Sequence, residues 1–184
     1  MLSSLINKIF NISNKENFNT IALEVFNFQY QNVPIYKSYI DLNKIDINEI
    51  NHFNKIPFLP IQFFKSHSVI TNNKSIDKTF LSSGTTKNKR SKHSLHDIEI
   101  YKKSFLSGFK KFYGDTQKWT ILALLPSYLE QGDSSLIYMV DQLIKLSNNK
   151  LSGYLDLEND NIENIIDSLK NENVLLVGVS YALL

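Results

Sequence analysis

The segment from residue 80 to residue 93 combines the residue types that phosphate binding requires. It reads Phe-Leu-Ser-Ser-Gly-Thr-Thr-Lys-Asn-Lys-Arg-Ser-Lys-His. Hydroxyl and backbone N–H groups can donate hydrogen bonds to phosphate oxygens, Gly84 lets the backbone turn and approach closely, and cations supply counter-charge. The candidate hydroxyl donors are Ser82, Ser83, Thr85 and Thr86, and the candidate cations are Lys87, Lys89, Arg90 and Lys92. The same small polar residues also build ordinary surface loops, so a solvated turn is the alternative interpretation.

The elements on either side determine how this segment is presented. Residues 78–81 are β-prone and end abruptly in small polar residues, which predicts that the segment leaves a strand. The apolar residues that follow recur at three- and four-residue spacing, which predicts one buried helical face that runs to about Tyr113. They are Leu95, Ile98, Tyr101, Phe105, Phe109 and Phe112. Gly114 and Asp115 end this helix, so we expect a strand, a loop and a helix in that order.

The phosphate segment does not follow the two best-known phosphate loops, because neither Gly-x-Gly-x-x-Gly nor Gly-x-x-x-x-Gly-Lys-Ser/Thr occurs in the sequence. Residues 82–86 instead resemble the Ser/Thr-Ser-Gly-Thr-Thr-Gly phosphate loop of the adenylate-forming superfamily. Residues 56–65 and 124–136 resemble its acyl-protein synthetase branch, which activates fatty acids in bacterial bioluminescence and is related to phenylacetate-CoA ligases. One departure is Lys87, where the family usually has glycine. A lysine can contact phosphate directly, or it can remove a positive-φ turn at a cost of roughly 1 kcal/mol.

The resemblance implies an ATP-dependent acid–thiol ligase similar to the long-chain fatty acid acyl-protein synthetases. A carboxylate would attack the α-phosphate of ATP, pyrophosphate would leave, and a thiol or an acyl-accepting protein would capture the acyl-adenylate. The hydroxyls and cations of residues 82–90, with Mg²⁺, would neutralise the departing pyrophosphate, and His93 would contact nucleotide phosphate. The family's adenine contacts, catalytic carboxylates and acyl-accepting cysteine would lie beyond Leu184. We therefore expect an N-terminal portion that is inactive alone, and no catalytic residue is assigned in it.

Other functions compete with this interpretation. The main alternative is a catalytically inactive module that binds an anion or a partner protein through its basic residues. A nucleic-acid partner is not expected, because the net charge is only +2 and no recognised nucleic-acid motif surrounds the basic run. His93 and His96 are spaced so that they can share a metal ion, but no cysteine or nearby carboxylate completes a ligand set, so no metal site is predicted.

A second candidate site follows the strand expected at residues 118–125. Ligands of open α/β sheets bind beyond the carboxyl ends of parallel strands, which is where residues 126–135 would lie. Four of these side chains can shape an acyl or nucleotide pocket: Ser127, Tyr128, Ser134 and Ser135. The alternative is that Asp133 and Ser134 only cap the next helix.

Composition places the chain among globular proteins. Its 184 residues are 42% hydrophobic and 12% aromatic, which suffices for a core. There is no cysteine, which excludes disulfides, thiolate metal ligands and a cysteine nucleophile and favours a cytoplasmic location. The apolar runs are far shorter than the ~20 residues of a membrane-spanning helix. Residues 1–10 lack the pattern of a signal peptide and predict a short amphipathic helix.

Residues 1–60 are expected to form a helical N-terminal segment. Residues 13–16 match a capping box that opens a helix, Pro34 suits the first turn of another, and Tyr36 and Tyr39 are expected in the core. The face expected to be buried on the first of these helices comprises Phe18, Ile21, Ala22, Val25, Phe28 and Gln29. Pro57 and Pro60 interrupt the helical pattern and predict an extended connector.

Residues 61–184 are expected to form an α/β portion with a mostly parallel sheet flanked by helices, corresponding to an incomplete large adenylation domain. Strands are predicted at residues 118–125, 151–157 and 174–179, and helices at residues 134–146 and 160–169. The strands are nearly continuous apolar runs, as expected when helices cover both faces of a parallel sheet. The chain stops just after a helix-capping serine, which we interpret as truncation at Leu184.

Overall fold

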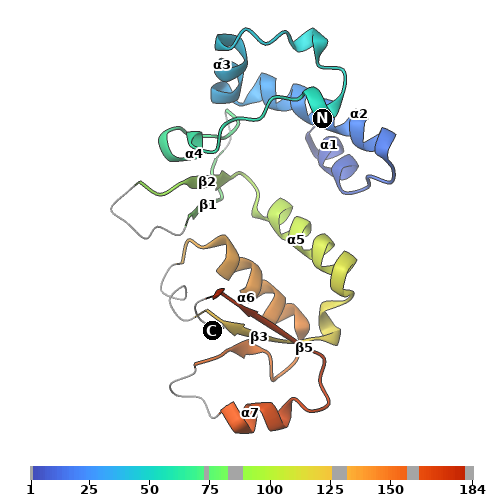
Figure 1. The fold of residues 1–184 in the computed structure, drawn as a ribbon, viewed down its shortest axis with the longest axis vertical. Coiled ribbons are helices and arrows are strands. Elements are labelled where there is room, and N and C mark those ends of the chain that lie inside the picture. Colours follow the sequence, from blue (N-terminus) through green and yellow to red (C-terminus); the bar gives the residue numbers. More distant parts are fainter. Residues whose placement is uncertain (1, 73–74, 83–88, 126–131, 157–161, 181–184) are drawn as a thin grey trace. The chain divides into compact units, whose positions relative to one another are not determined.

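The computed structural model describes residues 2–72, 75–82, 89–125, 132–156 and 162–180 (Figure 1). By its contacts the chain divides into two compact units, Met1–Ile100 and Tyr101–Leu184. The boundary expected after residue 60 falls inside the first unit. Among the described residues no helix has the length and apolar character needed to cross a membrane.

The first unit begins with helices and ends with a β-hairpin. Its helices are α1 (Leu2–Ile9), α2 (Lys15–Asn32), α3 (Pro34–Leu42) and α4 (Phe63–Ser66), with single 3₁₀ turns η1 (Ile47–Glu49) and η2 (Phe53–Lys55). The amphipathic helix expected near the N-terminus is therefore confirmed as α1.

The start of α2 corrects the predicted capping box by one residue. Asn14, not Ser13, is the N-cap: its backbone is extended, and its side chain accepts a hydrogen bond from the Asn17 N–H at 2.8 Å. The Asn17 side chain reaches back and accepts from the Ser13 N–H at 3.3 Å. Two asparagines thus make a variant of the capping box, in which the side chain at the third helical position accepts from the N–H of the residue before the N-cap and not from that of the N-cap itself.

The core of the first unit lies where α2 and α3 meet. Phe26, Val33, Tyr36 and Ile40 are buried there. Pro34 occupies the first turn of α3, as predicted, and the Tyr36 hydroxyl donates a hydrogen bond to the Pro57 carbonyl at 2.6 Å. The expected burial is wrong for Phe18, whose side chain is 42% exposed, and for Gln29, which is also exposed, because little of the chain covers α2 at these two positions.

The hairpin consists of β1 (Lys78–Leu81) and β2 (Lys92–Leu95). β1 confirms the predicted strand, but the predicted step from loop directly to helix is wrong, since β2 intervenes and pairs antiparallel with β1. Thr79 and Ser94 face each other across the pair, with their hydroxyl oxygens 3.0 Å apart. Pairing with β1 satisfies the backbone groups of β2, and this non-local gain outweighs its weak strand propensity.

The second unit contains a parallel three-stranded sheet in the order β4–β3–β5. Its strands are β3 (Thr120–Leu124), β4 (Gly153–Tyr154) and β5 (Val174–Gly178), and its helices are α5 (Ile98–Tyr113), α6 (Ser135–Ser147) and α7 (Ile162–Ser168), with a 3₁₀ turn η3 (Thr116–Lys118). The predicted β-α-β-α-β series is confirmed. The two crossovers run in opposite directions across the sheet, so right-handed connections place α6 and α7 on opposite faces (Figure 1).

The core of the second unit surrounds β3, which is buried along its whole length. Ile121 packs with Phe109 of α5 and Leu143 of α6. Helix α5 ends as predicted, at Gly114, whose φ of 78° suits glycine. Phe112 is 79% exposed, so its predicted place on the buried face is wrong. It lies three residues after Phe109, at the edge of the helical stripe, where the sheet no longer covers it.

Candidate phosphate-binding site

Ser82 closes the base of the candidate phosphate loop. Its N–H donates to the Ser91 carbonyl at 3.0 Å, and its hydroxyl oxygen accepts from the Ser91 N–H at 3.0 Å. The Ser82 carbonyl accepts from Arg90 Nε at 2.6 Å. These bonds extend the β1–β2 ladder by one pair. Because the Ser82 oxygen accepts from Ser91, its own O–H proton is still available to a ligand.

Five predicted phosphate-binding residues lie outside the described residues: Ser83, Gly84, Thr85, Thr86 and Lys87. The structure therefore places the two sides of the loop and not its tip. On the returning side, Lys89 is exposed and Arg90 is half-buried.

Arg90 supplies the strongest sign of an anion site. Its Nε is used by Ser82, while its Nη2 atom is buried and has no hydrogen-bond partner among the described residues. A buried guanidinium N–H without an acceptor is costly, and a phosphate oxygen is the acceptor that the planar arginine fork fits best. The described part of the hairpin therefore holds a cationic donor whose hydrogen-bonding capacity is not used by the described residues.

His93 lies in β2, directly opposite Phe80, and not in a loop that leads directly into a helix. Opposed residues of an antiparallel pair project from the same face, and Phe80 is buried. Although His93 keeps exposed surface, its ring packs against Phe64, and the resulting loss of water lowers the pKa of His93 below its usual 6.5. The imidazole is therefore neutral at pH 7 and can donate one hydrogen bond to phosphate.

The His96 ring lies within hydrogen-bond distance of two backbone carbonyls and is not placed to share a metal ion with His93. Its Nδ1 lies 2.6 Å from the Ser75 carbonyl and its Nε2 lies 3.1 Å from the Thr71 carbonyl. Both ring nitrogens thus face acceptors. Within the described ranges no group of three or more His, Cys, Asp or Glu side chains is arranged to hold a metal ion. The Mg²⁺ implied by the family resemblance therefore has no protein ligands assigned.

The second candidate site is only partly described, because Ser127 and Tyr128 lie outside the described residues. Ser134 is the N-cap of α6, and its buried hydroxyl accepts from the Ile137 N–H at 3.4 Å. The Ser135 carbonyl accepts from the Tyr101 hydroxyl at 3.1 Å. The capping role weighed for Ser134 is thus observed, and Ser135 holds α5 and α6 together within the second unit.

Known proteins do not identify this site. No family model, curated protein or solved structure matches the chain. The resemblance to acyl-protein synthetases rests on three short stretches of the sequence, residues 56–65, 82–86 and 124–136.

The structure draws attention to two residues, Ser91 and Tyr154, that were not singled out from the sequence. Ser91 closes the loop with Ser82, and the only signal for it is its place in the hydroxyl-rich run. Tyr154 ends β4 and its buried hydroxyl has no hydrogen-bond partner among the described residues. Burial, and secondarily the charge of Asp141, raises the pKa of Tyr154, so its hydroxyl stays protonated. A tyrosine at the carboxyl end of a predicted parallel strand is the pattern that would have indicated it.

Proposed function

We propose that the β1–β2 hairpin binds the pyrophosphate portion of ATP in an enzyme that activates a carboxylic acid as its acyl-adenylate. The observation that carries this proposal is the buried Nη2 of Arg90, which has no partner among the described residues and lies beside a loop closed by Ser82. The residues of the loop tip, from Ser83 to Lys87, supply further hydroxyl, N–H and cationic groups.

In this proposal the residues of the hairpin act by stabilising negative charge. A carboxylate oxygen forms a bond to the α-phosphorus, and the bond from that phosphorus to the bridging oxygen breaks, so that its electron pair leaves with pyrophosphate. Arg90 and the Ser82 O–H stabilise the charge that gathers on pyrophosphate, and neither needs to gain or lose a proton. In a later step a thiolate forms a bond to the acyl carbon, and the bond from that carbon to the phosphate oxygen breaks, so that its electron pair leaves with AMP. The described residues supply binding and charge, and no acid or base is assigned among them.

Calorimetric titration with pyrophosphate and with ATP tests the binding half of the proposal. Arg90→Gln removes the charge and the fork, and a charge-assisted hydrogen bond contributes about 1.5–3 kcal/mol, so we expect affinity to fall roughly 10- to 100-fold. Lys111→Gln is the matched control, because Lys111 is an exposed cation on α5 and should leave affinity unchanged. Failure of the wild-type chain to bind either ligand at millimolar concentration would overturn the proposal.

Exchange of labelled pyrophosphate into ATP tests the chemical half. An adenylating enzyme catalyses exchange only when its carboxylic acid is present, so a panel of acids both detects the reaction and identifies the substrate. The exchange assay is made on the full-length protein. If the protein binds pyrophosphate but no acid of the panel supports exchange of label into ATP, the alternative is favoured, namely a module that binds an anion and catalyses no reaction.

A further inference from the structure

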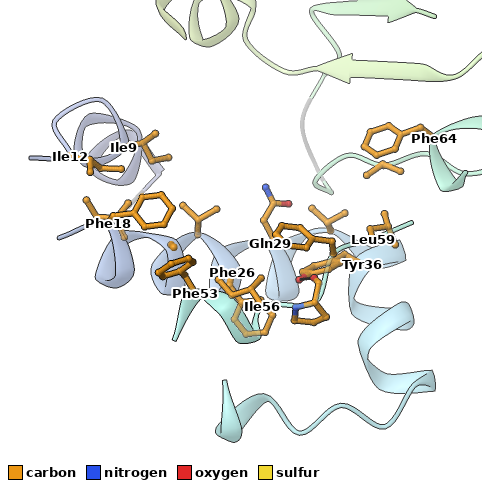
Figure 2. A pocket seen from close by; sticks show the side chains of 17 residues that line it. Ile9, Ile12, Phe18, Phe26, Gln29, Tyr36, Phe53, Ile56, Leu59 and Phe64 are labelled. Carbon is orange, nitrogen blue, oxygen red and sulfur yellow. Dashed lines mark hydrogen bonds between the residues drawn. The ribbon is translucent and has the colours of Figure 1, made fainter. Parts of the chain in front are cut away.

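A long apolar groove runs along α2 in the first unit. Its floor is the α2 face that begins at Phe18, and one wall is formed by the chain from residue 53 to residue 69 (Figure 2). Ile9 and Ile12 lie at one end, beside Phe18, while Leu59 and Phe64 lie at the other. The α2 face that the sequence assigns to a core is therefore the floor of an open groove.

The groove offers few partners to polar groups of a ligand. None of the described residues that line it is charged, and Gln29 is the one among them that carries an amide. The Tyr36 hydroxyl is already used, since it donates to the Pro57 carbonyl. An extended peptide laid in this groove would bury N–H and C=O groups without partners, which is costly. An α-helix pairs its own backbone groups and a hydrocarbon chain has none, so these two occupants remain.

The width of the apolar surface distinguishes the two occupants. Phe58 lines the groove and is 83% exposed, and the lining residues Phe18, Ile9 and Ile12 are 42%, 38% and 38% exposed. A single hydrocarbon chain packed on the floor would leave most of this surface in water. A helix with its side chains is about 10–12 Å across and reaches both the floor and the exposed side chains beside it. Exposed apolar surface gathered in this way is typical of a protein interaction site.

The length of the floor sets the length of the helix that fits it. Phe18 and Gln29 both line the groove on α2, and the eleven residue steps between them span about 16 Å at 1.5 Å per residue. A partner helix of about three turns covers this distance. Its apolar side chains would recur at three- and four-residue spacing, which is the pattern by which amphipathic helices occupy hydrophobic grooves.

Charged residues next in sequence to the lining residues indicate the charge of the partner. Two of the lysines are neutralised within the first unit: Lys8 by Glu24 at 2.8 Å and Lys37 by Asp41 at 2.6 Å. Lys55 precedes the lining residue Ile56, and Lys65 follows the lining residue Phe64. Both are exposed and have no carboxylate partner among the described residues, although Lys55 donates to the Glu49 carbonyl at 3.2 Å. The wall of residues 53–69 is therefore cationic, and acidic side chains complement it.

We propose that this groove binds an amphipathic helix of a partner protein, with the apolar face of that helix on α2 and acidic residues along its flank beside residues 53–69. Apolar contacts with the floor and with Phe58 supply the affinity. Lys55 and Lys65 select a helix with an acidic flank over one with a basic flank. The site lies outside the phosphate loop and requires no nucleotide, so the proposal goes beyond the proposed function and does not depend on it.

Fluorescence anisotropy with three labelled synthetic peptides of roughly 15 residues tests the proposal on the full-length protein. The first peptide has a leucine stripe at three- and four-residue spacing and a row of glutamates along one flank, on an alanine and glutamine background. The second has lysines in place of the glutamates, and the third has the composition of the first with its leucines spread around the helix. The first should bind at least about fivefold more tightly than the second at low salt. This difference should shrink at about 1 M salt, and the third peptide should not bind.

Substitutions at exposed positions locate the binding surface without disturbing the core. Phe58→Ala should reduce affinity for the acidic peptide at least about fivefold, because it removes an aromatic contact of the groove. Leu42→Ala is the matched control, since Leu42 is 81% exposed on α3 and does not line the groove. Lys55→Gln combined with Lys65→Gln should remove the preference for the acidic peptide, while Lys111→Gln, at an exposed cation on α5, should preserve it. A thermal melt followed by circular dichroism establishes that the variants are folded.

Four results would overturn the proposal. The first two are failure of the acidic peptide to bind at millimolar concentration and binding that Phe58→Ala leaves unchanged. Displacement of the peptide by laurate that binds more tightly would favour a lipid occupant. Self-association detected by light scattering and lost in Phe58→Ala would favour a second copy of the chain. Arg90→Gln should leave peptide affinity unaltered, so loss of pyrophosphate binding and loss of helix binding are independent results.

Discussion

The ring of Phe64 meets the imidazole of His93 edge to face, with 6.1 Å between ring centroids and 85° between ring planes. Phe64 lines the apolar groove, and His93 stands in the strand that returns from the candidate phosphate loop. One contact within the first unit therefore joins the end of the groove to the hairpin.

This contact predicts a pH dependence of stability. The folded-state pKa of His93 is lowered by loss of water from its ring, so below 6.5 the unfolded chain binds more protons than the folded chain. The free energy of unfolding should therefore fall as the pH drops from 6.5 towards the folded pKa, and be unaffected by this group above 6.5. Urea denaturation at a series of pH values measures the free energy of unfolding, and His93→Gln should flatten its dependence on pH below 6.5.

Phe64→Ala should return the His93 imidazole to water and raise its pKa towards the ordinary value. The titration of the His93 ring protons by NMR measures the pKa directly. Phe58→Ala removes a phenyl ring that is 83% exposed and is the matched control, with no expected change at His93. An unaltered His93 titration in Phe64→Ala would show that another group removes water from the imidazole.

The N-terminus of α2 predicts a difference between neighbouring residues. Asn14→Ala removes the side-chain acceptor for the Asn17 N–H and should lower the free energy of unfolding by about 0.5–2 kcal/mol. Ser13→Ala leaves the bond from the Ser13 N–H to the Asn17 side chain in place and should change it by less than about 0.5 kcal/mol. Urea denaturation of both variants measures the two losses, and a larger loss for Ser13→Ala than for Asn14→Ala would place the cap at Ser13.

Periodicity predicted the elements of this chain well and their surroundings less well. The parallel strands and their helices follow from apolar runs and stripes that are local in sequence, and β3, α6 and β5 lie within a few residues of where they were expected. β2 was missed because Lys92–Leu95 has no strand pattern of its own, and its stability comes from pairing with β1 on the other side of the loop.

For the candidate site, too, the sequence predicts the residue types but not their arrangement. The hydroxyl and cationic residues of the candidate phosphate loop can be named from the sequence, but the closure of the loop by Ser82 and Ser91 depends on the register of two strands. Likewise the stripe from Phe18 to Gln29 was identified as one face of a helix. A stripe does not reveal what covers it, and here a groove lies over residues assigned to the core.

The buried polar cluster beside β3 supports the last prediction. Thr120 is fully buried; its hydroxyl donates to the Glu172 carboxylate at 2.8 Å and accepts from Asn149 Nδ2 at 2.8 Å. Thr120→Val keeps the shape and removes both bonds, so we expect a loss of about 1–3 kcal/mol in the free energy of unfolding. In a double-mutant cycle, the losses in the free energy of unfolding caused by Thr120→Val and Glu172→Ala should be non-additive by about 0.5 kcal/mol or more, because both substitutions remove the same hydrogen bond. Asp167→Ala, at an exposed carboxylate paired with Lys170, is the matched partner that should combine additively with Thr120→Val. Additivity in both cycles would show that the hydroxyl and the carboxylate do not stabilise each other.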